Sequence, residues 1–376
     1  MEWKRSNFNR IAKKNLQIVS ESAEFANLER EWNALAGARQ TPLHSFEWFD
    51  ACRQAKDDKC DLLVFVSRVD GVARAIAPLV VDRSGVIPIL RSLDHFTCEV
   101  NHFIYSDDSA LAPVCAGILE AGLPLRLPKV RIDRAEMQCL RSASGGKGLM
   151  VERNADSLNY VPLEPEWSAL EQKMSSSRRW RLRSCRRKAE RSGRVRFDAV
   201  SPDAISVDGH LEELFRVEGA SWKAKAGTAM IKDSRMRRHI TAFARAAARL
   251  GTLRMFFLRI GDATAAAQMT SEHGGRLWCL KIGYDERWAK SSPGLLLMNE
   301  TLRYACERGL KSYEHLGTAE PWHHHWPIKT HACGSIRYYP PSISGGIRIL
   351  HDAGKLMGLR SRRALSYLHA RLPRPH

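Results

Sequence analysis

Three consecutive strand-like runs in the second half of the chain constrain its fold more than any other feature. These runs are Leu253–Ile260, Thr264–Ser271 and Arg276–Gly283, and all three are rich in apolar residues. The first two are joined at Gly261-Asp262 and the last two at Gly274-Gly275. Short glycine-containing connections of this kind favour antiparallel hairpins. The pattern therefore predicts a three-stranded antiparallel meander.

A helix with clear boundary signals follows the third strand. Pro293 stands at its first position and Gly309 just beyond its last turn, which is the expected placement of both residues. The unpaired amide groups at a helix N-terminus suit a pyrophosphate, such as that of coenzyme A. Gly294 would let a phosphate approach the backbone closely, and Arg287 and Lys290 add positive charge nearby. We therefore expect an anion-binding turn at this helix start.

The first half predicts a mixture of helices and strands. Phe25–Leu35 and Phe46–Gln54 have helical spacing, whereas Leu62–Arg68 and Ala73–Val81 are strand-like and flank Asp70-Gly71, a strong hairpin signal. We expect a long basic helix that begins after the prolines at 162 and 165 and ends at about residue 192. The expected segments are a flexible N-terminus (1–15), an N-terminal domain (16–161), a basic bridging helix (162–193), a C-terminal domain (194–344) and a basic amphipathic tail (345–376).

The net charge of +18 is concentrated in two places. Lys173–Arg196 holds eleven Lys or Arg and one acid, and Gly345–His376 holds seven Lys or Arg and one Asp. Local basic patches favour an anionic partner. For the basic helix a solvated face, an anionic acceptor or membrane surface, and nucleic acid all stay open, with nucleic acid the least favoured. The tail could equally lie on a membrane or dock on the protein.

Targeting and metal signals are missing from the sequence. The N-terminal residues Met1–Leu16 are polar and basic, and no apolar stretch is long enough for a membrane span, so we expect a cytoplasmic protein with possible contact at the inner membrane face. The run His323-His324-His325 cannot aim three rings at one ion, and the cysteines form no CxxC pair, so no metal is expected.

Many short motifs in a fixed order carry a resemblance to a known family. In chain order they are Trp32, Leu35-Ala36, Thr41-Pro42, Ser45–Trp48, Ala77–Leu79, Leu93–His95, the Arg-rich helix with Gly193, Ser221–Lys223, Ala265–Ala267, Tyr284-Asp285, Ser292–Leu296, Gly309, Tyr313-Glu314 and Gly317. Over most of its length the chain resembles the CelD-like branch of the GNAT acyltransferases, the group named for cellulose biosynthesis. The resemblance implies an α/β (α+β) fold of tandem GNAT-like domains, each a mixed, mainly antiparallel sheet flanked by helices.

The resemblance also implies an activity and its site. An acyl group would pass from acetyl-CoA or a longer acyl-CoA to an amine or hydroxyl of a large acceptor, such as an amino sugar of an exopolysaccharide or a lipid-linked precursor. The expected donor-binding residues are Leu280, Ile282, Arg287, Lys290, Ser291, Ser292, Gly294 and Leu295. The expected acceptor-binding residues are Asp94, His95, Trp222 and Lys223.

Acyl transfer needs a proton acceptor and donors for the oxyanion. The oxyanion donors are expected among the backbone amides of Leu280–Gly283, and the catalytic candidates are Glu314, His315 and His323. Where family members tend to carry Tyr-Lys, this chain has Trp322-His323. Two other functions stay open: a Fem-like transferase that uses aminoacyl-tRNA, and a GNAT-like scaffold without catalysis at the membrane surface.

Overall fold

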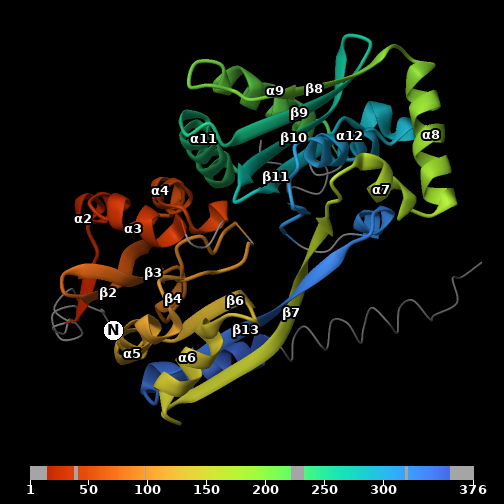
Figure 1. The fold of residues 1–376 in the computed structure, drawn as a ribbon. Coiled ribbons are helices and arrows are strands. Elements are labelled where there is room, and N and C mark those ends of the chain that lie inside the picture. The colour runs from red at the N-terminus through yellow and green to blue at the C-terminus, as the bar shows by residue number, and fades with distance from the viewer. Residues whose placement is uncertain (1–14, 38–40, 98, 222–232, 318–320, 356–376) are drawn as a thin grey trace, which may run out of the picture.

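The computed structural model describes residues 15–37, 41–97, 99–221, 233–317 and 321–355 (Figure 1). The first half contains β1 (Leu16–Val19), α2 (Ser22–Ala26), α3 (Glu29–Ala36), α4 (Phe46–Ala55), β2 (Cys60–Val69), β3 (Val72–Asp82), β4 (Ile89–Ser92), β5 (Ile104–Tyr105), α5 (Leu111–Glu120), β6 (Leu125–Arg131), α6 (Ala135–Ser144) and β7 (Leu149–Pro162). The second half contains α7 (Trp167–Gln172), α8 (Ser176–Glu190), β8 (Val195–Val200), α9 (Val207–Gly219), α11 (Ser234–Arg249), β9 (Leu253–Ile260), β10 (Ala263–His273), β11 (Arg276–Tyr284), η4 (Glu286–Ser291), α12 (Pro293–Glu307), β12 (Ser312–Glu314), η5 (Pro321–His325) and β13 (Lys329–Tyr339).

One large, mainly antiparallel sheet runs through the molecule, with helices on its faces (Figure 1). Its strand order is β1-β2-β3-β4-β6-β13-β7-β12-β11-β10-β9-β8, and β5 pairs with β3 beside this path. Only the joints β4/β6 and β11/β12 are parallel among the described pairs. The expected class, a mixed α/β fold with mainly antiparallel sheet flanked by helices, is confirmed.

The two halves repeat one order of elements. In the first half the meander β2-β3-β4 is followed by α5 and by β6, which lies parallel to β4. In the second half the meander β9-β10-β11 is followed by α12 and by β12, which lies parallel to β11. The hairpin predicted around Asp70-Gly71 forms, and both residues have positive φ, as a tight two-residue turn requires.

The last strand of each half completes the sheet of the other half. β7 pairs with β12 of the second half, whereas β13 pairs with β6 of the first half and with β7. Ile336 and Tyr338 of β13 are accordingly buried in the core that β2, β3, α5 and α6 build, and Val161 of β7 is buried in the core around α12. The sheet is therefore continuous across the boundary expected near residue 161.

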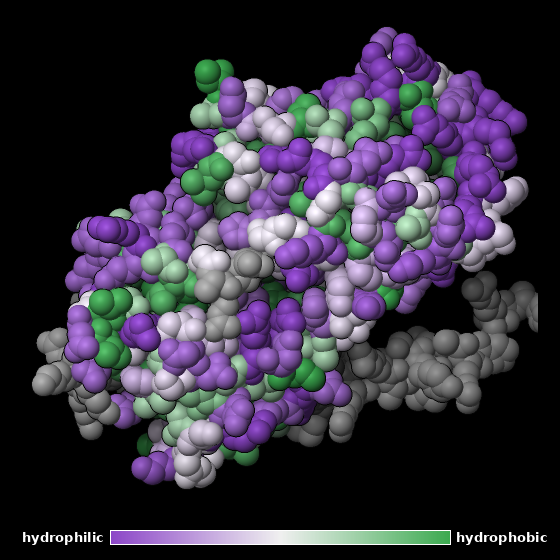
Figure 2. Space-filling view, in the orientation of Figure 1, coloured by the Kyte–Doolittle hydropathy of each residue, from purple (hydrophilic) through white to green (hydrophobic). Residues whose placement is uncertain are grey.

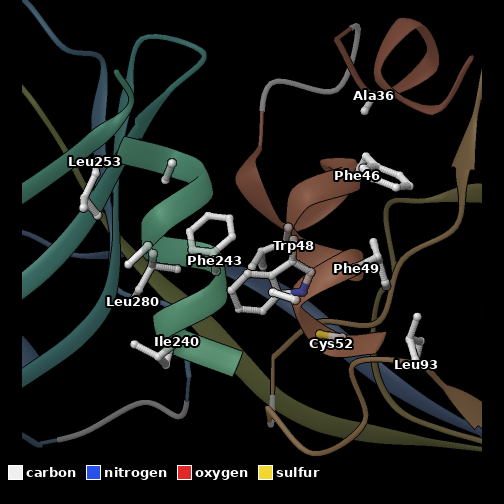
Figure 3. Packing of buried hydrophobic residues seen from close by; sticks show 14 of the residues in the cluster. Ala36, Phe46, Trp48, Phe49, Cys52, Leu93, Ile240, Phe243, Leu253 and Leu280 are labelled. Carbon is white, nitrogen blue, oxygen red and sulfur yellow. The ribbon is translucent and has the colours of Figure 1, made fainter. Parts of the chain in front are cut away.

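A second contact between the halves is formed by helices. Trp48 of α4 packs edge-on against Phe243 and His239 of α11, with ring centroids 5.2 Å and 4.5 Å apart (Figure 3). Ser45 begins α4, because its side chain accepts a hydrogen bond from the Trp48 amide. The position of the first half relative to the second is thus fixed by side chains as well as by exchanged strands.

The basic segment forms two helices rather than the single long helix that we expected. Ser175 begins α8 by accepting a hydrogen bond from the Arg178 amide, which separates α8 from α7. Leu182, Cys185 and Ala189 form the apolar face of α8, and all three are buried. This face packs beside α12 and η4, so α8 stands at the start of α12.

The described part of the tail is a helix from residue 343 to residue 355. Its exposed apolar residues are Ile343, Ile347 and Leu350, whereas Ile349 is half-buried. Asp352 of this helix contacts Arg337 and Tyr339 of β13. No helix among the described residues is long and apolar enough to cross a membrane.

Candidate functional site

The sheet opens between β11 and β12. These parallel strands pair only at Leu277 with Tyr313 and at Trp278 with Glu314. The other edge of β11 stays paired with β10 as far as Tyr284. From Cys279 onward the described strands show no pairing between β11 and β12, and the two strands diverge. This is the place where the sequence located the oxyanion donors.

Helix α12 begins at the mouth of this opening. Pro293 is its first residue, and Ser292 before it is in the left-handed conformation with φ 48°. The amides of Leu295 and Leu296 turn back to the Ser292 carbonyl, at 3.0 and 3.2 Å. The Gly294 amide lies in the same first turn, where a helix concentrates positive partial charge. A Cβ at Gly294 would meet only Tyr284, at 3.5 Å, so the space above this turn is open.

A cavity of about 690 Å³ joins the sheet opening to the start of α12. A ligand the size of a cofactor fits a space of this order. Its lining residues are Thr97, Glu99, Arg181, Ser221, Cys279, Leu280, Lys281, Ile282, Gly283, Tyr284, Ala289, Ser292, Gly294, Leu295, His315, Leu316, Gly317, Trp322, His323 and His325. Both halves of the chain therefore contribute to one cavity.

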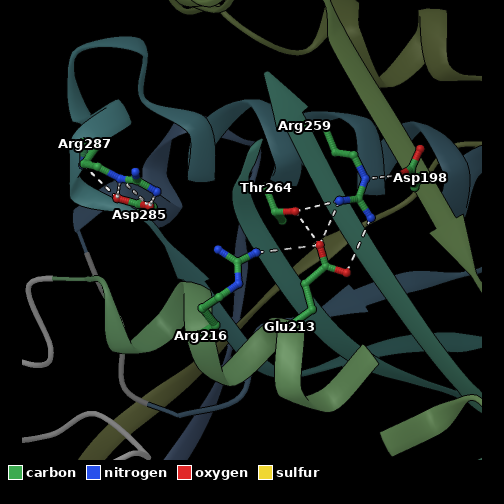
Figure 4. A network of polar contacts seen from close by, with 7 residues as sticks. All are labelled: Asp198, Glu213, Arg216, Arg259, Thr264, Asp285 and Arg287. Carbon is green, nitrogen blue, oxygen red and sulfur yellow. Dashed lines mark hydrogen bonds and ion pairs between the residues drawn. The ribbon is translucent and has the colours of Figure 1, made fainter. Parts of the chain in front are cut away.

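Five of the eight expected donor-binding residues line this cavity, namely Leu280, Ile282, Ser292, Gly294 and Leu295. The other three do not. The Arg287 side chain is 73% exposed and is bound by the Asp285 carboxylate (Figure 4). Lys290 is exposed, and Ser291 is buried behind the turn. Arg181 of α8 and Lys281 of β11 supply the positive charge on the cavity wall instead.

The wall near Gly283 depends on the absence of a side chain. A Cβ at Gly283 would lie 3.0 Å from Cα of Glu218 in α9 and 3.1 Å from its Cβ and Cγ. Such contacts are shorter than ordinary packing distances, so either the strand or the helix would have to move. Gly283 thus lets α9 cover the end of β11 without closing the cavity.

Of the three catalytic candidates, His315 and His323 line the cavity and Glu314 does not. Neighbouring residues of a strand face opposite sides, and Tyr313, Glu314 and His315 alternate in this way. The Glu314 carboxylate accepts hydrogen bonds from Ser312 and Arg276, at 2.6 and 2.9 Å. Burial opposes its charge, but hydrogen bonds from His331, Ser312 and Arg276 outweigh burial and lower the Glu314 pKa. The geometry therefore favours a positioning role for Glu314 over proton abstraction.

The two histidines form a stacked pair that an exchanged strand supports. The ring centroids of His315 and His323 are 4.0 Å apart. Asn159 of β7 donates its side-chain amide to Nδ1 of His323 at 3.1 Å, and its carbonyl accepts the His315 amide at 3.0 Å. The part of the cavity wall that these two histidines form is thus supported by a strand from the other half of the chain.

Burial keeps both rings neutral. It lowers the pKa of His323 to about 4 and, with the charge of His323, holds the pKa of His315 well below its usual value. Nε2 of His315 is buried and has no hydrogen-bond partner among the described residues. Buried polar atoms are rarely left in this state. A neutral imidazole nitrogen is therefore available to a bound ligand.

The first half contributes Thr97 and Glu99 rather than the expected Asp94 and His95. Glu99 accepts the Gly317 amide on Oε2 at 2.9 Å, and Lys129 donates to the Gly317 carbonyl at 2.8 Å. Leu316 and Gly317 both have positive φ, so these contacts hold a strained turn that lines the cavity. Burial raises the pKa of Glu99, and the Gly317 amide and the charges of Lys281 and Lys129 oppose that effect.

Asp94 holds the loop that carries Glu99. It is buried, and it accepts hydrogen bonds from the side chains of Ser92 and Asn101. His95 donates its Nδ1–H to the Ser92 carbonyl at 2.9 Å, and burial lowers the pKa of His95 to about 4. Neither residue is among those that line the cavity. The predicted acceptor residues Trp222 and Lys223 lie outside the described residues, although Ser221 before them lines the cavity.

Replacement of Asp94 should change how stability depends on pH. Burial raises the Asp94 pKa from 3.8 to about 6, so between these values the folded protein holds a proton that the unfolded chain releases. The contribution of Asp94 to the free energy of unfolding therefore falls as pH rises through that window, by about 3 kcal/mol in total. Urea unfolding at about pH 4 and about pH 7 should show this fall in the wild type and in the exposed control Asp262→Asn, but not in Asp94→Asn. Equal pH dependence in all three proteins would contradict the assignment.

Comparisons with known proteins agree with this geometry. Residues 176–324 match the family model of the acetyltransferase (GNAT) domain. This segment begins with α8 and ends within η5, so it contains β9–β11, α12 and β12. The second half of the chain is therefore similar to a GNAT domain. No curated protein matches the chain.

Several solved structures share the fold over nearly the whole chain. FemX has a TM-score of 0.57 at 11% identity, with 86% of this chain and 97% of that chain covered. The C-terminal domain of a putative lysylphosphatidylglycerol synthetase from Agrobacterium fabrum has a TM-score of 0.54 at 11% identity, with 88% and 97% covered. A protein of unknown function from Bacteroides thetaiotaomicron has a TM-score of 0.55 at 9% identity, with 85% and 98% covered. At these identities the similarity concerns the fold alone.

Proposed function

We propose that this protein transfers an acyl group from acyl-CoA to an amine or hydroxyl of a large acceptor held between its two halves. The observation that carries the proposal is the single cavity that runs from the start of α12 along the open edge of β11 to Glu99. One such space can hold a thioester donor and an acceptor together, with the thioester carbon next to the attacking atom.

The two ends of the cavity suit different parts of the reaction. The coenzyme A pyrophosphate would bind the amides at the start of α12, with Arg181 nearby. The pantetheine arm would follow β11 as an added strand, and an amide in Leu280–Gly283 would donate to the thioester oxygen as it gains charge. The acceptor would lie against His315, His323 and Glu99.

The chemical step then requires little beyond these groups. The acceptor nitrogen or oxygen attacks the thioester carbon and its proton passes to Glu99. The coenzyme A thiolate then leaves and receives that proton from Glu99 through water, which restores the carboxylate. Glu99 suits proton abstraction because burial raises its pKa. We propose an amino sugar of an exopolysaccharide, or a lipid-linked precursor, as the acceptor, on the strength of the resemblance to CelD-like proteins.

A calorimetric titration with acetyl-CoA and longer acyl-CoAs tests the donor. We expect saturable binding of one acyl-CoA per chain. A second donor, aminoacyl-tRNA, deserves the same titration because FemX shares the fold across the whole chain and α8 is strongly basic. Binding of aminoacyl-tRNA with a steep salt dependence and no binding of any acyl-CoA would replace the first donor with the second.

A valine at position 294 should block the donor site without unfolding the protein. Its side chain would occupy the open space above the first turn of α12, where only Tyr284 lies within 4 Å of the added Cβ. We expect Gly294→Val to weaken acetyl-CoA binding at least about tenfold, because the phosphate could no longer reach the amides. The control Gly209→Val, in a helix where nothing lies within 4 Å, should leave binding unchanged. Equal affinity in both variants would place the donor elsewhere.

A further inference from the structure

The outer face of α8 carries one continuous stripe of exposed side chains. Trp180, Arg183, Arg187 and Arg191 follow one another at intervals of three or four residues, so they lie on one side of the helix. All four are exposed, and Trp180 is 61% exposed. The opposite side of α8 is the face that packs on the protein. We call these four residues the α8 stripe.

The cations of the α8 stripe are not used to stabilise the fold. Within the described residues, Arg183, Arg187 and Arg191 have no carboxylate at ion-pair distance, and the same holds for Arg181 and Lys188 beside them. Several exposed arginines in other parts of the structure do pair with acids. Examples are Arg141 with Glu152, Arg237 with Glu212 and Arg245 with Asp208.

Unpaired cations on one helix repel each other, so an external anion would be attracted to this face and would relieve the repulsion. The stripe stands at the edge of the molecule, where α8 projects beyond the sheet (Figure 1). Figure 2, in the same orientation, shows this corner covered by strongly hydrophilic side chains. Arg181 of the same helix lines the cavity wall, so α8 itself borders the cavity.

We propose that the α8 stripe docks the protein on an anionic lipid surface, with the mouth of the cavity next to the headgroups. Arginines attract anionic headgroups, and tryptophan is favoured at the boundary between headgroups and acyl chains. Because α8 lies at the edge of the molecule (Figure 1), its outer face can contact the flat surface of a lipid bilayer. Docking of this kind would bring a lipid-linked acceptor to the cavity, but it does not depend on which donor the protein uses.

A single-stranded polynucleotide fits the α8 stripe less well. Proteins that bind such strands without sequence preference use a basic groove and several aromatic side chains on which successive bases stack. The α8 stripe lies on an exposed helix and holds one aromatic residue, Trp180. A lipid surface is therefore the favoured anion, and a polynucleotide becomes an outcome of the test.

Vesicle sedimentation with the full chain tests the proposal. We expect binding to vesicles with about one third phosphatidylglycerol and none to pure phosphatidylcholine. Replacement of the three stripe arginines by glutamine should weaken binding more than about a hundred-fold, because each basic residue near an anionic surface contributes severalfold. A matched control, Lys147→Gln with Arg238→Gln and Lys311→Gln, removes the same charge from exposed positions elsewhere and should retain binding.

Quenching by brominated phosphatidylcholine in mixed vesicles then locates the contact. The wild type should lose more fluorescence than Trp180→Phe, because Trp180 would lie at the depth of the bromines. Thiol release from acetyl-CoA in solution should be equal in all variants, so a failure of docking stays distinct from a failure of the proposed reaction. The proposal is overturned if the wild type ignores anionic vesicles, if the control loses binding as the stripe variant does, or if a uridine oligonucleotide binds the stripe more tightly than the vesicles.

Discussion

Glu99→Gln is expected to lower the kcat/KM of acyl transfer by about a hundred-fold or more, the usual effect of losing a general base. The substitution keeps the side-chain oxygen that accepts the Gly317 amide, so the turn at Leu316-Gly317 should persist. It removes the group that takes the acceptor's proton. Because burial raises the Glu99 pKa, wild-type kcat/KM should rise with pH through a value above the usual glutamate range, and the variant should lack this rise.

The measurement is thiol release from acetyl-CoA, with glucosamine as acceptor and with water alone, together with the calorimetric Kd for acetyl-CoA. Glu136→Gln serves as the matched control, because Glu136 is also buried with a raised pKa but lies against Tyr105 in the core of the first half. This control should keep both the rate and its pH dependence. Glu99 is not the base if Glu99→Gln retains the wild-type rate, or if it weakens acetyl-CoA binding as much as it slows transfer.

Separate expression of the two halves, residues 1–162 and 163–376, is expected to give chains that do not fold. The first piece would lack β13, which covers β6 and places Ile336 and Tyr338 in its core. Loss of a large buried side chain costs about 2–5 kcal/mol, and whole domains are stable by only about 5–15 kcal/mol. The second piece would lack β7, its Val161 and the contact of α11 with Trp48.

Urea unfolding followed by circular dichroism checks this expectation. Neither piece alone should show a cooperative transition, whereas the two pieces expressed together should recover one, because the exchanged strands can then pair. A cooperative transition in either isolated piece would mean that the strand exchange is not required for folding. It would also support the division into independent domains near residue 161, which stays a prediction.

Local elements of the fold could be read from the sequence, and the exchange of strands could not. The meander β9-β10-β11, the start of α12 and the hairpin at Asp70-Gly71 depend on residues close together in the chain, where periodicity and turn residues act. β13 pairs instead with β6 and β7, which lie far from it in sequence. The residues of β13 do not show that it pairs with β6 and β7 rather than with β12, the strand just before it in the sequence.

More of the expected donor-binding residues than of the expected acceptor-binding residues line the cavity, for a similar reason. Ser292 and Gly294 belong to a turn whose chemistry is visible in its own residues. The choice between Glu314 and His315 depends on which face of a strand each presents, and a shift of one residue reverses that face. Glu99 lies in a loop without periodicity, five residues after Asp94, so only the folded chain brings it to Gly317.

Hydrogen–deuterium exchange with and without saturating acetyl-CoA tests the central claim most directly, because it locates the donor on the chain. We predict slower exchange in peptides that cover Cys279–Tyr284 and Ser292–Leu296, where the open edge of β11 and the first turn of α12 would bind the pantetheine arm and the pyrophosphate. Binding of acetyl-CoA with unchanged exchange in both segments, or protection confined to the first half of the chain, would contradict a donor site at the start of α12.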